Sequence, residues 1–142
     1  MRTAIAFVVC FLCAVVFAGC GGSEPKPIPA KGIVKFDDGT IPQGEVAVIR
    51  FEPVASVATE GSPQAGVASA NLQPDGRFVL GTLDKDDGAY AGDYKVVIVL
   101  RKSYLEGGDV VHPKFAKAAT TPLSATVSAS QTNDFELVVQ KP

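Results

Sequence analysis

Apolar and polar residues alternate with a period of two along most of the chain after residue 30. Such alternation is typical of strands that bury one face and expose the other. The segments that show it are KGIVKF, EVAVIRFEP, GRFVLGTL, DYKVVIVLR, PLSATVSA and NDFELVV, with GVASANL as a weaker, more polar candidate. The side chains expected on the buried faces are Val34, Phe36, Ala47, Ile49, Phe51, Phe78, Leu80, Tyr94, Val96, Ile98, Leu100, Leu123, Ala125, Val127, Phe135, Leu137 and Val139.

Residues that favour tight turns separate these segments. Asp38-Gly39, Pro74-Asp75-Gly76 and Asp87-Gly88 supply the left-handed or proline-fixed positions that turns need. No stretch of ten or more residues in this part of the chain carries a helical apolar stripe with caps. The pattern predicts an all-β fold, a Greek-key sandwich of about seven antiparallel strands. The chain has no tryptophan, which argues against an antibody-type domain.

The first twenty residues follow a different pattern. Arg2 precedes an uncharged, mostly apolar run from Thr3 to Cys20, which is the layout of a signal peptide. The stretch Phe17-Ala18-Gly19-Cys20 resembles the lipobox of bacterial lipoproteins, with Phe17 where that family usually has leucine. The resemblance implies cleavage between Gly19 and Cys20 and a diacylglycerol on the Cys20 thiol.

Lipidation of Cys20 would attach the protein firmly to a membrane, since each buried methylene contributes ~0.8 kcal/mol. Two alternatives stay open: a retained transmembrane helix, because ~18 apolar residues can just span a bilayer, and secretion after cleavage behind Cys20. The residues after Cys20 are rich in glycine and then in proline, as in a partly extended tether. The expected parts are a signal peptide (1–19), a lipidated tether (20–30) and a β-sandwich domain (31–142).

Several turn-and-strand motifs occur in a fixed order along the domain. They are Gly32 to Val34, Asp38-Gly39, Asp75 to Phe78, Gly92 to Val96 and Asn133 to Leu137. Together with the lipobox, this order resembles planctomycete-type small lipoproteins with a carboxypeptidase-regulatory-like, transthyretin-like domain. The resemblance implies a prealbumin-like sandwich on a cell-envelope lipoprotein, with no established activity. Hydroxyisourate hydrolases share a transthyretin-like fold but use several histidines, whereas this chain has one and ends in VVQKP.

Charge and cysteine usage exclude some classes of function. The formal net charge is −2, and removing residues 1–19 removes one cation, Arg2, so the processed chain is slightly more acidic. That balance argues against nucleic-acid binding, which needs a clustered basic face. Cys10 and Cys13 have the spacing of a redox or zinc pair, but both lie inside the apolar run. We interpret them as small hydrophobic residues of a signal peptide that is removed.

Chemistry-bearing residues are sparse. His112 is the single histidine and precedes Pro113 in a predicted loop, so a zinc site is implausible and His112 is expected to be an ordinary surface residue. The chain has no G-x-S-x-G nucleophile elbow. The acidic stretch 84–88 does not follow the EF-hand order, which favours a solvated turn over weak calcium binding. We therefore expect no enzyme activity, no metal and no cofactor.

The longest interval without a clear strand runs from Tyr104 to Pro122, and long loops of sandwiches often carry recognition. Tyr104, His112 and Phe115, with Tyr90 from an earlier turn, are the candidate ligand contacts. In the alternative, Phe115 fills the edge of the sandwich.

These observations predict a lipid-anchored, non-catalytic binding or structural module on the periplasm-facing side of an envelope membrane. The outer membrane is favoured by analogy, because Gly21 and not aspartate follows Cys20. The expected partners are the membrane itself and an envelope protein or glycan. The alternatives are a carbohydrate-binding accessory module acting through Tyr104 or Tyr90, and a hydrolase with an unrecognised site, whose activity a His112→Ala variant would have to lose.

Overall fold

The alternating segments form strands at the predicted places in a computed structural model, which describes residues 25–54, 66–105 and 107–142. In that part of the chain the elements are β1 (Ala30–Phe36), β2 (Val46–Pro53), β3 (Ala68–Asn71), β4 (Arg77–Val79), β5 (Gly92–Arg101), the short 3-10 helix η1 (Pro113–Ala116), β6 (Ser124–Val127) and β7 (Asn133–Val139). No described helix is long and apolar enough to cross a bilayer. The predicted all-β class is confirmed.

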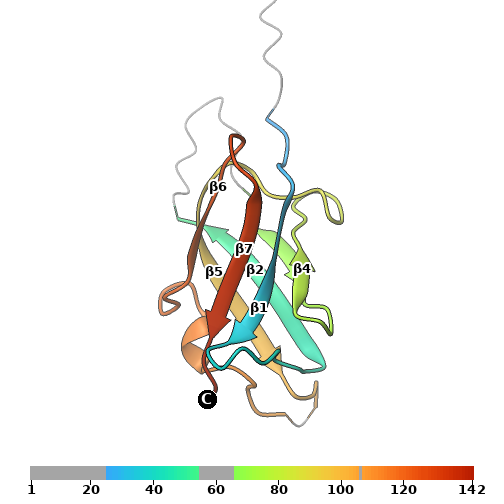
Figure 1. Ribbon diagram of the computed structural model, residues 1–142, viewed down its shortest axis with the longest axis vertical. Helices are drawn as coiled ribbons and strands as arrows, with labels where there is room; N and C mark the ends of the chain where they lie inside the picture. The colour runs from blue at the N-terminus through green and yellow to red at the C-terminus, as the bar shows by residue number, and fades with distance from the viewer. Residues whose placement is uncertain (1–24, 55–65, 106) are drawn as a thin grey trace, which may run out of the picture.

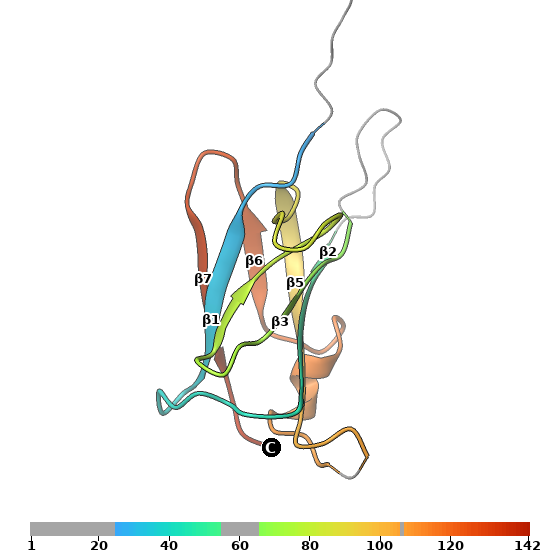
Figure 2. The same ribbon diagram turned by 90° about the vertical axis from the view of Figure 1, so that its right-hand side faces the viewer.

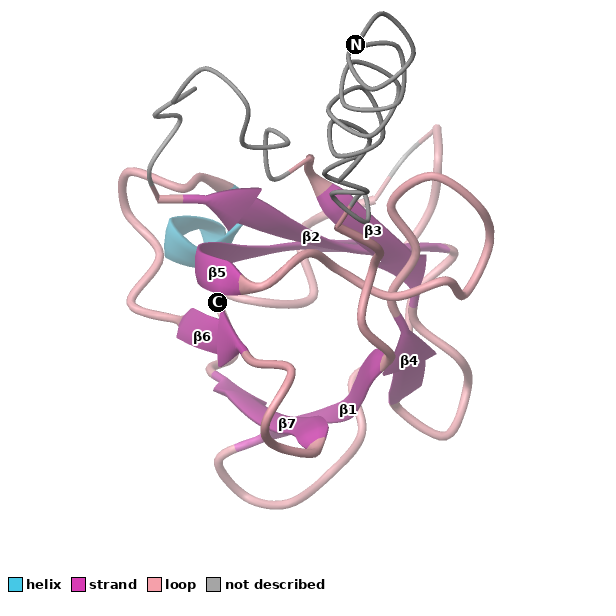
Figure 3. Cartoon of the chain, turned by 90° about the horizontal axis from the view of Figure 1, so that it is seen from above, coloured by secondary structure: helices cyan, strands magenta, loops and turns pink. Residues whose placement is uncertain are grey.

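The strands form two sheets that face each other, β4-β1-β7 and β3-β2-β5-β6. Figure 2 shows the two layers from the side, and Figure 3 shows them from above. The sandwich is therefore confirmed, but the expectation that all strands are antiparallel is wrong for one pair. β1 and β7 run parallel, with Ala30 opposite Asn133 and Phe36 opposite Val139. Parallel neighbours need a long crossover connection, which here is the whole domain between these strands.

The core lies between the sheets and is centred on Phe51. Its ring centroid lies 6.2 Å from that of Phe78, 5.9 Å from that of Tyr94 and 5.4 Å from that of Phe135. Tilted aromatic pairs at these distances stabilise a core by ~0.5–1.5 kcal/mol each beyond their burial. Nearly all predicted inward positions are buried, although Ala47, Leu123 and Phe135 are only partly so.

The two ends of the sandwich carry different segments, as Figure 1 shows. One end, here called the tether end, holds the chain that enters β1, the 81–88 loop and the turn 128–132 between β6 and β7. Ile28 in the entering chain forms a bridge with Ala89 there. The opposite end holds the β1–β2 connection, the segment after β5 and the C-terminus. At that end Lys141 is bonded to Asp38 at 2.8 Å, which fixes the last residues to the first turn.

Candidate functional site

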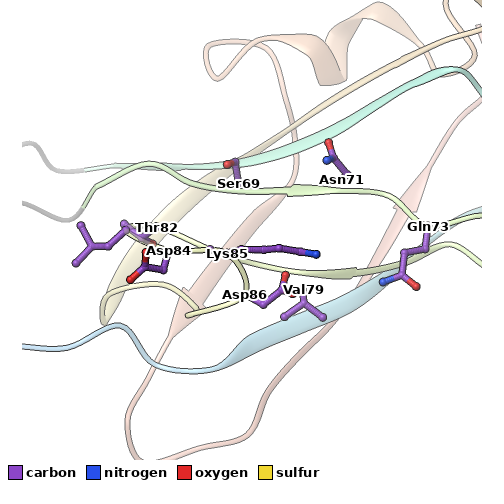
Figure 4. Close-up of a pocket in the computed structure, with 10 residues that line it drawn as sticks. Ser69, Asn71, Gln73, Val79, Thr82, Asp84, Lys85 and Asp86 are labelled. Atoms are coloured by element: carbon purple, nitrogen blue, oxygen red, sulfur yellow. The ribbon is translucent and has the colours of Figure 1, made fainter.

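A polar groove of about 520 Å³ lies where the outer edges of β3 and β4 converge. The two sheets meet here because Ser69 and Gly81 exchange both backbone hydrogen bonds, each of 2.9 Å. The residues that follow β4, an edge strand of one sheet, therefore pair with β3, an edge strand of the other sheet. The outer surface of this junction, together with the loop that follows it, forms the groove (Figure 4).

One side of the groove is a row of uncharged polar side chains. The alternation of β3 directs Ser69 and Asn71 to the same exposed face, and the exposed Gln73 follows in the turn that leads to β4. Figure 4 shows the first two side by side, with Gln73 further along. None of the three side chains is hydrogen-bonded to another described residue, so their donors and acceptors are open to solvent.

The other side of the groove is the 82–86 loop, which Asp87 holds in shape. Its carboxylate accepts the backbone N–H groups of Thr82 at 2.6 Å, Leu83 at 3.1 Å and Asp84 at 3.0 Å. The Thr82 hydroxyl donates to the carbonyl oxygen of Gly88 at 2.8 Å. The bond from the Thr82 amide, with those from Asp84 and Leu83, lowers the pKa of Asp87 below its ordinary value. The loop is therefore built around an ionised carboxylate.

The charged groups of the groove nearly balance one another. Lys85 extends along it, and Asp84 and Asp86 flank this cation in the sequence (Figure 4). Since the Asp87 carboxylate is used by three amides, it is not free to bind a cation. No cluster of three potential metal ligands occurs among the described residues. The groove therefore presents hydroxyl and amide groups to a ligand, and its one lysine and two aspartates leave it with a small net negative charge.

The predicted contact residue Phe115 is not available to a ligand. Its side chain is only 2 % exposed and belongs to the hydrophobic core, so the prediction of a contact there is wrong. The alternative, in which Phe115 fills the sandwich, describes the structure. The physical reason is that η1 turns this aromatic ring inward against β5.

His112 precedes η1 on the surface. Its Nδ1 accepts the backbone N–H of Lys114 at 3.2 Å, so the side chain caps η1. The backbone N–H of His112 donates to the carbonyl oxygen of Gln140 at 2.8 Å. His112 is therefore a surface residue with a structural contact.

The two candidate tyrosines do not share a site. Tyr90 precedes β5 and Tyr104 follows it, and ten residues of strand span about 33 Å at ~3.3 Å per residue. Tyr90 is partly buried, and its carbonyl oxygen accepts the Tyr94 hydroxyl at 2.7 Å. Tyr104 is 76 % exposed at the end opposite the tether. Neither tyrosine lines the polar groove.

Gly19 and Cys20, the predicted cleavage and lipidation residues, lie outside the described residues. The acidic stretch 84–88 of this groove was singled out from the sequence as a solvated turn, but Ser69, Asn71 and Gln73 on the other side were missed. The signal that could have found them is the pair Ser69 and Asn71, because two hydrogen-bonding side chains at strand spacing share one face of β3.

Comparison with known proteins gives little about this site. No protein-family model matches the chain, and no curated protein matches it. One solved structure, from Pseudomonas aeruginosa and described as a "putative carbohydrate binding protein", aligns with a TM-score of 0.43 and 18% identity. The alignment covers 81% of this chain and 90% of that one. At this distance the likeness assigns no function to the groove.

Proposed function

We propose that this protein is a lipid-anchored β-sandwich of the cell envelope that binds a saccharide in the polar groove, without catalysing a reaction. The observation that carries the proposal is the row of solvent-open hydroxyl and amide groups opposite a rigid polar loop. Asn and Gln side chains both donate and accept hydrogen bonds, and so do serine and threonine hydroxyls. Sugar hydroxyls have the same dual character, so a neutral polyhydroxylated ligand matches these groups best.

Other ligand classes fit the groove less well. A simple anion would meet two carboxylates beside the single lysine, and a hard cation would find too few free oxygen ligands. A nucleic acid would need a clustered basic face. The proposed ligand is therefore bound by hydrogen bonds and needs no charge of its own.

A binding role is also favoured over catalysis. The general acid of a glycosidase lies in an apolar environment that keeps it protonated, whereas Asp84 and Asp86 are both exposed. His112 caps η1 and does not line the groove. The hydrolase alternative requires activity that a His112→Ala variant loses.

The envelope anchor is the second part of the proposal. The lipobox-like residues that end at Cys20 and the glycine- and proline-rich tether support a lipoprotein of the planctomycete type with a carboxypeptidase-regulatory-like domain. The sandwich begins at Ala30, close behind that tether. We place the protein on the periplasm-facing side of an envelope membrane, with the outer membrane favoured.

The groove is tested by measuring saccharide binding on a broad glycan panel, followed by calorimetry on the best ligand. An Asn71→Ala/Gln73→Ala variant removes two hydrogen-bonding groups of ~1 kcal/mol each, so its affinity should fall about thirtyfold. Ser124→Ala, an exposed polar strand residue outside the groove, should change affinity less than twofold. No binding across the panel would contradict the proposal. Binding that is lost in Tyr104→Ala but kept in the double variant would place the ligand at the opposite end.

The anchor is tested by the intact mass of the protein purified from membranes. The processed chain should begin at Cys20 and carry acyl groups, and a Cys20→Ser variant should remain uncleaved or free of lipid. A lipid-free, soluble wild-type protein would contradict the anchor without affecting the groove.

A further inference from the structure

A second groove, of about 310 Å³, lies next to the polar one and has the opposite character. Its walls are the entering chain from Ile28 to Lys31 and the turn from Gln131 to Asn133, and Val79 of β4 closes it. The surface it presents is almost entirely apolar. This groove belongs to the tether end of the sandwich, where the chain enters β1 (Figure 1).

The backbone explains why this groove is apolar although strand ends and turns form it. The carbonyl oxygen of Ile28 accepts the N–H of Ala89 at 3.0 Å, and that of Ala30 accepts the N–H of Leu80 at 2.9 Å. The carbonyl oxygen of Pro29 accepts the Asn133 side-chain amide at 3.4 Å. All three carbonyl groups are thus already hydrogen-bonded, so a ligand here gains mainly by covering hydrocarbon.

The two grooves meet at Val79, which lines both of them. Val79 is the last residue of the edge strand β4, and its side chain is 37% exposed. Polar groups from β3 and the 82–86 loop lie on one side of it, and the apolar groove lies on the other. Val79 is therefore the residue at which the polar groove and the apolar groove adjoin.

We propose that the two adjoining grooves bind one amphiphile, with a saccharide head in the polar groove and an alkyl chain across Val79 in the apolar groove. The inference rests on the proposed saccharide function and specifies its ligand as a glycolipid. A volume of about 310 Å³ corresponds to about ten water molecules at ~30 Å³ each, which is enough for an alkyl chain of several carbons.

The position of the apolar groove agrees with a lipid ligand. Ile28, which lines it, is eight residues from Cys20, a distance that an extended chain covers in at most ~29 Å. In the proposed anchored protein the groove therefore stays within reach of the membrane that holds the lipids. Leu83 lines the polar groove at the same end of the sandwich and is 70% exposed, so an exposed apolar side chain also lies at this end.

The test measures the binding of hexyl, heptyl and octyl β-glucoside, each below its micellar concentration, by calorimetry. The protein is the processed chain from residue 20 with Cys20→Ser, so that no acyl group of its own competes. Affinity should rise about fourfold with each added methylene, because each one covers apolar surface. Val79→Asp and Thr132→Asp, which place a carboxylate at the boundary and on the far wall, should each abolish this rise.

The matched control is Val138→Asp. Val138 is 41% exposed on β7 of the same sheet and lines neither groove, so this variant should keep the full dependence on chain length. Asn71→Ala should lower the affinity for all three glucosides by the same factor, because Asn71 is proposed to bind the saccharide head that they share. Thermal unfolding of each variant shows whether the fold is intact.

Two results would overturn the inference. Affinity that does not depend on chain length, while Asn71→Ala still weakens binding, would leave the saccharide site standing and remove its lipid half. A chain-length dependence that survives both Val79→Asp and Thr132→Asp would place the alkyl chain elsewhere. Failure of every glucoside and every panel saccharide to bind would reject the proposed function together with this inference.

Discussion

The carboxylate of Asp87 accepts the backbone N–H of Thr82 at 2.6 Å, across five residues of the loop that forms one side of the polar groove. Two further amides bind the same carboxylate, so a single side chain holds the loop that carries Thr82, Asp84, Lys85 and Asp86. The shape of the groove therefore depends on a residue that does not itself line it.

Asp87→Asn should lower the thermal midpoint at neutral pH, because a neutral amide oxygen accepts these hydrogen bonds less strongly. The pKa of Asp87 is lowered in the folded protein, mainly by the Thr82 amide, so its contribution is present above the ordinary value of 3.8 and is lost as the pH falls through the folded value. The difference in thermal midpoint between wild type and Asp87→Asn should therefore become smaller below about pH 4. Asp86→Asn, one residue away, is the control and should keep the thermal midpoint of wild type at neutral pH, since the three loop amides bind Asp87 and not Asp86.

Gly32→Ala should destabilise the sandwich by ~1–3 kcal/mol or more, because the added methyl group has no room. A Cβ at this position would overlap the carbonyl oxygen of Phe135 and lie 2.7 Å from Cζ of Phe78. Denaturant unfolding measures the loss. Gly108→Ala is the matched control, since no described atom lies within 4 Å of its added Cβ. Equal stability of the two variants would contradict the close approach of β7 to β1.

Phe115→Ala should cost ~3–5 kcal/mol of unfolding free energy, which is typical for removing a large buried side chain. His112→Ala, at the exposed cap of the same short helix, should cost only ~0.5–2 kcal/mol. Chemical denaturation of both variants checks the comparison. A Phe115→Ala variant of wild-type stability would restore this residue as a candidate ligand contact.

Tyr94→Phe should lower stability by ~1 kcal/mol, because it removes the hydrogen bond from the Tyr94 hydroxyl to the Tyr90 carbonyl oxygen. Burial of this hydroxyl raises its pKa above the ordinary 10.0, so the protonated form is favoured in the folded state. Its contribution is present below pH 10 and is lost as the pH rises through the folded value. Wild type should therefore lose stability above about pH 10 more steeply than Tyr94→Phe, with the exposed Tyr104→Phe behaving as wild type.

The sequence by itself determined the strands and their buried faces. Period-two alternation is a local property, so the inward side of Phe78 and Leu80, or of Tyr94, Val96 and Ile98, follows from neighbours along the chain. The turn glycines were equally readable, and Gly39, Gly76 and Gly88 all have positive φ.

Only the tertiary structure decided which strands are neighbours and what their edges form. The parallel pairing of β1 with β7 joins residues about a hundred positions apart, and no local pattern encodes the direction of such a pair. The polar groove appears only when β3 and the loop after β4 meet at the Ser69–Gly81 bridge. Phe115 is buried for the same reason, because a loop residue's exposure depends on distant segments that pack over it.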